Sequence, residues 1–360
     1  MKVVVFGATG VIGRAAAERF GLRPECEVLA VSRRAVDLPG VVHVPLDLSD
    51  ADATASMLRS RPFDGTTHVV FAALQESPDL ASGWQDTSLI DHNVAMFRNA
   101  LEPLATVDDA ALRHVSLLQG AKAYGFHVGR SPVPGKERAV RDAHQNFYFA
   151  QEDILRGLAD TARWSWTVFR PQVVYGESFG SPMNLVPALG VYAALEREAG
   201  RALSFPGSLE GVHEAVDARL LARALAWAAE APAARDEVFN VTNGDVFSWR
   251  DVWSSIAAVF DMDVGDPVAQ RLAQVMPPRA SEWADLVARH RLEAPADMAA
   301  FVGGSWMYAD LLFGGSGRSG PPALLSTIKI RQAGFGECVD TEDMLCDWLQ
   351  QFQAKRFFPR

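Results

Sequence analysis

The chain lacks several features that would indicate particular protein classes. Its three cysteines, Cys26, Cys338 and Cys346, are an odd number without a CxxC pair, and its eight histidines show neither HxH nor HExxH spacing, so neither disulfides nor a metal site is indicated. No run reaches the ~18 apolar residues that a membrane span needs. The formal net charge of −10 disfavours nucleic acid and anionic membrane surfaces as partners. We therefore expect small or neutral partners.

What the chain does contain is ample material for a folded core. Its 360 residues are 49% hydrophobic and 22% charged, with 28 glycines and 20 prolines, which excludes a disordered or collagen-like protein. Residues 1–6 carry one lysine and lead at once into Gly7, which predicts a first strand rather than a secretion signal. We therefore expect a cytoplasmic protein.

Short apolar runs alternate with helix-like runs through the first half of the chain. This alternation predicts an α/β fold, a Rossmann-type doubly wound parallel sheet covered on both faces, with a smaller, mostly helical C-terminal part. Strands are predicted over residues 3–6, 27–31, 41–44, 68–72, 112–117, 165–170 and 237–241. Helices are predicted over residues 11–20, 51–58, 87–104, 146–158, 183–198, 218–230 and 249–260.

The first predicted strand runs into a glycine-rich turn with the spacing GxxGxxG and then into an alanine-rich helix. Gly7 permits the tight turn, Gly10 lets the backbone approach a pyrophosphate, and Gly13 lets the helix pack on the strand. The helix N-terminus offers N–H groups and a positive dipole end to phosphates. The pattern predicts a dinucleotide-binding turn, in which we include Thr9, Val11 and Ile12.

The second predicted strand ends in Ser32, Arg33 and Arg34, where NAD-preferring folds usually place an acidic residue on the ribose 2′-hydroxyl. Arginine matches phosphate geometry, so these residues indicate the 2′-phosphate of NADP, with one of the two arginines expected to be solvated. Asp47 and Leu48 are placed to border the adenine, although Asp47 could equally cap the next helix.

The glycine pattern and the size of the sheet resemble the extended short-chain dehydrogenase/reductases, but their catalytic signature is absent. That signature is Tyr-x-x-x-Lys on the helix after the fifth strand, with a serine at the end of that strand. Here the residue four positions after Tyr148 is Glu152, and the usual serine position, four before Tyr124, is Gly120. A lysine is present instead at Lys122.

Tyr148 and Lys122, a tyrosine and a lysine outside the usual spacing, belong to a more specific resemblance. Asn146-Phe147-Tyr148 followed by Glu152-Asp153 resembles the NFYYxxED motif of the progesterone 5β-reductase/iridoid synthase-like (PRISE) family, with Phe149 in place of the second tyrosine. The loop after Tyr124 is also altered. Further matches cover nearly the whole chain, at residues 32–34, 67–69, 96–99, 170–171, 183–185, 191–194 and 239–247 and in a tryptophan-rich C-terminal part.

The resemblance implies an oxidoreductase that carries out NADPH-dependent 1,4-reduction of enones and enals. Hydride addition to the β carbon builds negative charge on the carbonyl oxygen, so a donor aimed at that oxygen lowers the barrier. Tyr148 is the expected donor, since a phenol with a pKa of ~10 donates without first ionising. Lys122 is expected beside the nicotinamide ribose or the Tyr148 oxygen, and water is expected to protonate the α carbon.

Further contacts and a division of the chain are also expected, with the residues that end the fourth and sixth strands contributing backbone groups. Cofactor contacts are expected from Ala72, Ala73, Leu74, Gln119, Pro171 and Val174, and substrate walls from Phe126, Met183 and Trp306. We expect an NADP-binding domain over residues 1–176, to which 212–258 return, and a substrate-binding part over 177–211 and 259–360. Glu152 and Asp153 are expected to pair with nearby arginines. A homodimer is expected only from the family likeness.

Three alternatives remain at this stage. The same site could reduce a carbonyl directly, because hydride need only land on the nearer carbon. A sugar-nucleotide epimerase or dehydratase suits an extended fold, but the missing Tyr-x-x-x-Lys and serine argue against it. A protein that binds NADPH as a sensor or scaffold without turnover is the third alternative, and the presence of both Tyr148 and Lys122 argues against it.

Overall fold

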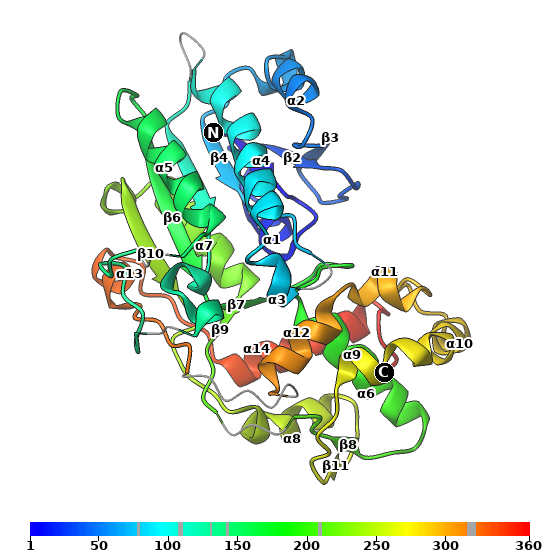
Figure 1. The fold of residues 1–360 in the computed structure, drawn as a ribbon. Coiled ribbons are helices and arrows are strands. Elements are labelled where there is room, and N and C mark those ends of the chain that lie inside the picture. The colour runs from blue at the N-terminus through cyan, green and yellow to red at the C-terminus, as the bar shows by residue number, and fades with distance from the viewer. Residues whose placement is uncertain (78–79, 107–110, 130–131, 142–143, 208–210, 315–321) are drawn as a thin grey trace.

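A computed structural model describes the whole chain apart from residues 78–79, 107–110, 130–131, 142–143, 208–210 and 315–321. In the described residues, seven parallel strands form one central sheet (Figure 1). Their spatial order is β10 (Glu237–Val241), β6 (Ser165–Pro171), β5 (His114–Leu118), β4 (His68–Phe71), β1 (Lys2–Phe6), β2 (Glu27–Ser32) and β3 (Val41–Pro45). The order reverses direction between β1 and β4, and ligands of doubly wound sheets bind at the carboxyl ends of the strands near such a reversal.

Both faces of the sheet are buried, which explains the unbroken apolar runs of its strands. Along β1, Val3 and Val5 belong to one hydrophobic cluster, whereas Val4 and Phe6 belong to another on the opposite face. The first face is covered by α1 (Val11–Gly21) and α7 (Ala218–Ala228). The second is covered by α2 (Ala51–Leu58), α4 (Thr87–Ala105) and α5 (Phe147–Ala159). The predicted doubly wound α/β fold is therefore confirmed.

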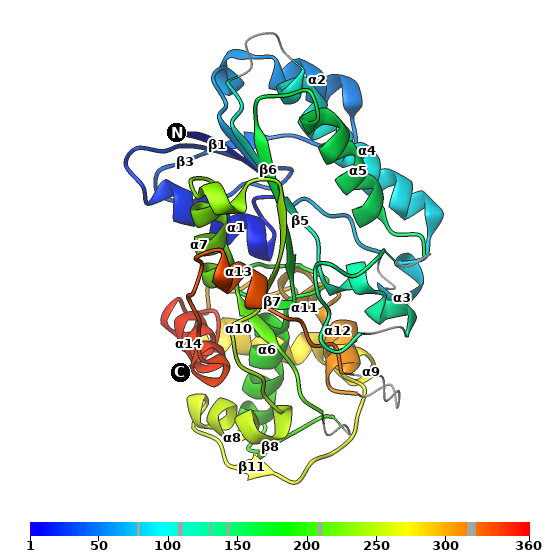
Figure 2. The ribbon, with the colours of Figure 1, turned by 90° about the vertical axis from the view of Figure 1, so that its left-hand side faces the viewer.

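The C-terminal half builds a second, mainly helical core below the sheet (Figures 1 and 2). Its helices are α6 (Leu185–Glu198), α8 (Trp249–Val259), α9 (Leu272–Val275), α10 (Ala280–His290), α11 (Met298–Val302), α12 (Ser305–Leu312) and α14 (Thr341–Ala354). Two small parallel sheets accompany them, one of β7 (Val173–Tyr175) with β9 (Ala215–Asp217) and one of β8 (Leu203–Ser204) with β11 (Val264–Gly265). Aromatic rings from distant segments pack in this core. For example, Trp249 and Phe313 pack edge to face with 4.8 Å between their ring centres.

Short elements complete the description. They are α3 (Leu80–Gly83), α13 (Ile328–Gln332) and the 3₁₀ helices η1 (Arg61–Phe63), η2 (Ala121–Tyr124), η3 (Phe126–Val128), η4 (Pro232–Ala234) and η5 (Pro277–Arg279). The segment 212–258 divides between the two cores, because α7 and β10 join the sheet whereas α8 packs against α14 in the C-terminal core. Within the described residues, no helix is long and apolar enough to cross a membrane.

Candidate active site

The glycine-rich turn lies between β1 and α1 and is too crowded for side chains at two of its glycines. Gly7 has a φ of +82°, and a Cβ there would lie 2.6 Å from the backbone nitrogen of Ala73. A Cβ on Gly13 would lie 2.2 Å from the Gly7 carbonyl oxygen. Gly10 is the N-cap residue of α1 and makes no side-chain cap, so this helix end is bare backbone. These features fit the pyrophosphate of a dinucleotide, which helix N–H groups would hold.

The other residues predicted in this turn contribute backbone rather than free side chains. The Thr9 carbonyl accepts a hydrogen bond from Ser178 Oγ at 3.0 Å. Val11 is buried against helix α7, and Ile12 packs against the core on the α1 face of the sheet. Their predicted contacts with a cofactor would therefore involve main-chain atoms.

The two arginines after β2 lie in different surroundings. Arg33 is exposed, and its guanidinium reaches Gln75 Oε1 only at 3.4 Å. Arg34 donates to the Phe179 carbonyl at 3.1 Å and so joins the end of β2 to the segment after β7. Ser32 Oγ donates to the Arg34 carbonyl at 2.7 Å and shapes the turn that carries both. Of the two, Arg33 has the freer guanidinium for a phosphate.

The two roles weighed for Asp47 can now be compared with its contacts. Asp50 is the N-cap of α2, since its side chain accepts from the Ala53 N–H at 2.9 Å. Asp47 instead accepts from the N–H and Oγ of Ser49 at 3.0 and 2.8 Å, and these bonds lower the pKa of its carboxyl. Leu48 is buried. Asp47 therefore closes the turn before α2 rather than capping the helix.

Tyr148 lies in the first turn of α5, where hydrogen bonds fix both its backbone N–H and its backbone carbonyl. The side chain of Asn146 accepts from the Tyr148 N–H at 3.0 Å, and Gln119 Nε2 donates to the Tyr148 carbonyl at 2.9 Å. The residue is only 5% exposed. Burial, followed by the nearby Glu76 and Tyr308, raises the pKa of the phenol well above 10. Tyr148 therefore stays protonated and can act as a hydrogen-bond donor.

Gly120 explains how the hydroxyl of Tyr148 fits. It occupies the position where the superfamily signature has serine, and a Cβ there would lie 3.2 Å from the Tyr148 oxygen. It would also lie 3.7 Å from the carbonyl oxygen of Pro171, the last residue of β6. The absence of a side chain at Gly120 therefore leaves room for the Tyr148 hydroxyl.

Lys122 lies beside Tyr148, so the structure brings the two predicted catalytic residues together. Its Nζ is 5.9 Å from the centre of the Tyr148 ring and 4.4 Å from the centre of the Trp84 ring. The side chain is 16% exposed and forms an ion pair with Glu76 Oε1 at 3.1 Å. Burial lowers the pKa of Lys122, and Glu76 acts in the opposite direction.

Sequence reasoning missed Glu76 and Trp84. Glu76 follows β4 by five positions in a loop, and only tertiary contacts show that its side chain is buried next to Lys122. The loop is held because Gln75 exchanges two hydrogen bonds with the buried Asn93 of α4, each of 2.9 Å. Trp84 Nε1 donates to Glu76 Oε2 at 3.1 Å. The sequence held no signal for these contacts beyond an acidic residue after a strand that was already expected to border the cofactor.

A buried polar network supports α5 from behind. Glu152 forms ion pairs with Arg170 at 3.1 Å and with Arg156 at 2.8 Å, and Asp153 pairs with Arg141 at 2.6 Å, so the expected pairing of this acidic pair with arginines is confirmed. Gln119 accepts from Arg170 Nε at 2.9 Å. The side chain of Gln119 therefore supports Tyr148, because both ends of its amide are hydrogen-bonded, and its predicted cofactor contact stays a prediction.

The remaining predicted contacts are dispersed. Ala72 and Ala73 lie against Gly7, as the crowding there shows, and Leu74 follows them with an exposed side chain. Val174, in β7, packs between two hydrophobic clusters. Among the predicted substrate walls, Phe126 follows the Lys122 segment in η3 and Met183 is half-buried before α6. Trp306 is buried in the core of the C-terminal helices, which is a packing position.

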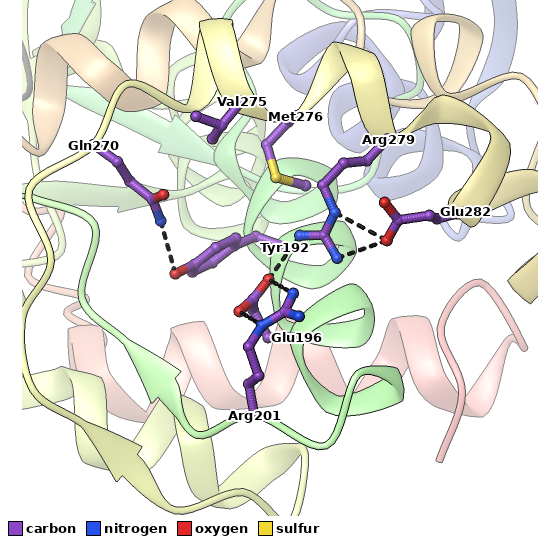
Figure 3. A pocket seen from close by; sticks show the side chains of 8 residues that line it. All are labelled: Tyr192, Glu196, Arg201, Gln270, Val275, Met276, Arg279 and Glu282. Carbon is purple, nitrogen blue, oxygen red and sulfur yellow. Dashed lines mark hydrogen bonds and ion pairs between the residues drawn. The ribbon is translucent and has the colours of Figure 1, made fainter.

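A separate polar cavity lies between α6 and the α9–α10 region and has a volume of about 320 Å³ (Figure 3). Glu196 is its centre and pairs with Arg201 and Arg279, each at 2.7 Å. The complete lining is Tyr192, Glu196, Arg201, Gln270, Val275, Met276, Arg279 and Glu282, which includes none of the residues predicted for catalysis or cofactor binding. This cavity is thus distinct from the candidate active site.

Comparisons with known proteins show which family this chain resembles. The model of the NAD dependent epimerase/dehydratase family matches residues 3–242. A 3-oxo-Delta(4,5)-steroid 5-beta-reductase of Arabidopsis thaliana is 30% identical over 99% of this chain and 92% of its own length. An (S)-8-oxocitronellyl enol synthase of Catharanthus roseus is 32% identical over 86% of this chain and 81% of its own. Among solved structures, a UDP-glucose 4-epimerase of Thermotoga maritima shares the fold, with a TM-score of 0.66, 16% identity and coverage of 98% and 99%.

Proposed function

The chain belongs to the NAD dependent epimerase/dehydratase family and, within it, to the progesterone 5β-reductase and iridoid synthase-like enzymes, and on that premise we propose that it reduces the carbon–carbon double bond of enones and enals with NADPH. It is an oxidoreductase of the short-chain dehydrogenase/reductase type. The observation that carries the proposal is the juxtaposition of Tyr148 and Lys122 beside the carboxyl ends of β5 and β6.

The residues fit a nicotinamide dinucleotide, which supplies the hydride when bound. The crowded turn at Gly7 and Gly13 and the bare helix end after Gly10 would hold its pyrophosphate. Arg33 and Arg34 after β2 would favour the 2′-phosphate of NADPH over the free hydroxyl of NADH. The guanidinium of Arg33, which has only the long contact with Gln75, is the better placed of the two.

Tyr148 would hold the substrate carbonyl. Its phenol is neutral because burial raises its pKa, so the O–H donates to the carbonyl oxygen as negative charge develops there. The Lys122 ammonium, 5.9 Å from the centre of the Tyr148 ring, adds positive potential at the same place. Protonation of the α carbon needs only water, since no acidic side chain has to reach that carbon.

The substrate pose separates conjugate reduction from direct carbonyl reduction, which stays the second candidate because Tyr148 would hold the carbonyl in both. An epimerase is disfavoured by a specific contact. The residue four positions after Tyr148 is Glu152, which is buried in ion pairs with Arg156 and Arg170 instead of presenting a lysine to the site. A sensor without turnover would not require a buried phenol beside an ammonium.

The test is to incubate the protein with NADPH and a series of small enones and enals, to follow the loss of NADPH absorbance, and to identify the product by NMR. The proposal expects a saturated ketone or aldehyde. An allylic alcohol would support direct carbonyl reduction, and binding of NADPH without any turnover would support a sensor.

A further inference from the structure

Glu76 is a buried carboxylate built into the candidate active site. Its side chain is 3% exposed, and both oxygens are engaged, Oε1 by Lys122 Nζ and Oε2 by Trp84 Nε1, each at 3.1 Å. The backbone that carries it is fixed by the paired hydrogen bonds between Gln75 and Asn93. Glu76 therefore has one defined position, with its charge directed at the ammonium.

The ion pair makes the formal charge of this part of the site zero. Lys122 contributes one positive charge and Glu76 one negative charge, while the indole of Trp84 covers the ammonium at 4.4 Å. Two other titratable side chains near the pair, Tyr148 and His127, have pKa values shifted toward their neutral forms. The pKa of the Tyr148 phenol is raised by burial, and burial, followed by His144 and Lys122, lowers the pKa of His127 to about 4.

We propose that Glu76 is a specificity-determining residue that makes the site select uncharged substrates over carboxylate-bearing ones. The inference rests on the proposed reductase function and adds to it a criterion for the substrate. A carboxylate on the substrate would have to compete with Glu76 for the Lys122 ammonium, and it would lose its hydration without gaining a free counter-ion. An uncharged enone loses no such hydration, and its carbonyl needs only the Tyr148 hydroxyl.

Removing one charge of the pair at a time gives the proposal its test. Replacing Glu76 by Gln preserves the size of the side chain and an oxygen that can accept from Trp84, but leaves Lys122 without its negative partner. A carboxylate on the substrate could then take the place of Glu76 beside Lys122, so the site should accept an anionic substrate better. Replacing Lys122 by Met removes the ammonium that a substrate carboxylate would need as its counter-ion, so binding of the anionic substrate should weaken further. The double variant is again neutral.

The probes are (E)-6-oxohept-4-enoate and its methyl ester, which share one enone and differ in a single charge. The measured quantity is the preference for the ester over the acid, as a ratio of kcat/KM values and, in the NADP⁺-loaded protein, as a ratio of Kd values from calorimetry. We expect the preference to fall about tenfold in Glu76→Gln, to rise in Lys122→Met, and to return toward the wild-type value in the double variant. For variants with low turnover, the preference is taken from the Kd ratio instead of the kcat/KM ratio.

Glu196→Gln is the matched control, because it removes another partly buried carboxylate from two arginines in the separate cavity of Figure 3 and should leave the preference unchanged. An equal loss for both probes in Glu76→Gln, with an unchanged ratio, would assign Glu76 a structural role and overturn the proposal. If Glu76→Gln does not fold, the Lys122→Met ratio decides, and an unchanged value there rejects the idea. A wild-type protein that reduces neither these probes nor any enone or enal of the series described above would instead refute the reductase function itself.

Discussion

Replacing Tyr148 by Phe removes one hydroxyl and little else. The ring of Tyr148 packs edge to face on Phe147 at 4.6 Å and lies near Lys122, and a phenyl ring keeps both contacts. The Tyr148 N–H and carbonyl stay bonded to Asn146 and Gln119 through the backbone. We therefore expect the free energy of unfolding of Tyr148→Phe to lie within about 1 kcal/mol of the wild-type value. Any large kinetic effect then belongs to the hydroxyl.

The size of that effect follows from the role given to the hydroxyl. Loss of a single donor to a developing oxyanion lowers kcat by about 10²–10³. Hydride transfer to an enone should slow by this factor in Tyr148→Phe, while the Kd for NADPH should hold, since no cofactor contact is assigned to the phenol. Stopped-flow measurement of NADPH oxidation gives the rate, and fluorescence titration gives the Kd. Equal losses in rate and in NADPH affinity, or a kcat within a fewfold of wild type, would refute the assignment.

Three further predictions concern other parts of the chain. Gly120→Ala should lower kcat with little change in folding, since the new methyl would stand 3.2 Å from the Tyr148 oxygen; unchanged kinetics would count against the fit described. Replacing both Arg33 and Arg34 by Ala should reduce the NADPH-over-NADH preference in kcat/KM at least about tenfold, and an unchanged ratio would remove them from the 2′-phosphate site. Burial raises the pKa of Glu214 from 4.5 to about 7, so the stability given by its neutral form is complete below 4.5 and is lost as the pH rises through 7. Glu214→Gln should therefore be more stable than the wild type at pH 8, by no more than about 2 kcal/mol, and similar at pH 4.5, as urea titrations at the two pH values would show.

The parts of the fold that depend on local pattern could be predicted from the sequence. Residues 3–6 are predicted as a strand buried on both faces. The glycines that follow predict a tight turn at Gly7 and close packing of the helix at Gly13, and the short distances at both positions confirm this. The proximity of Tyr148 and Lys122 needed more than pattern, because 26 positions separate them. The family resemblance supplied it.

The parts that depend on tertiary contacts could not be predicted. Glu76 and Trp84 lie in the segment between β4 and α4, where nothing in the spacing shows that two side chains turn inward toward Lys122. Gln119 follows β5 at the edge of the sheet where ligands bind, so its position predicts a cofactor contact. The sequence does not show that its side-chain amide hydrogen-bonds with the buried Arg170 and Glu152. A buried polar network leaves no periodic signature in a single sequence.

The measurement that tests the central claim most directly is the destination of the hydride. The protein is incubated with NADPH that carries deuterium at C4 of the nicotinamide, on the transferred face, together with a simple enone, and the product is analysed by ²H and ¹H NMR. A carbonyl held by Tyr148 in the proposed pose places deuterium on the β carbon of a saturated ketone. Deuterium on the carbinol carbon of an allylic alcohol, or no transfer to any enone tested, would contradict the account.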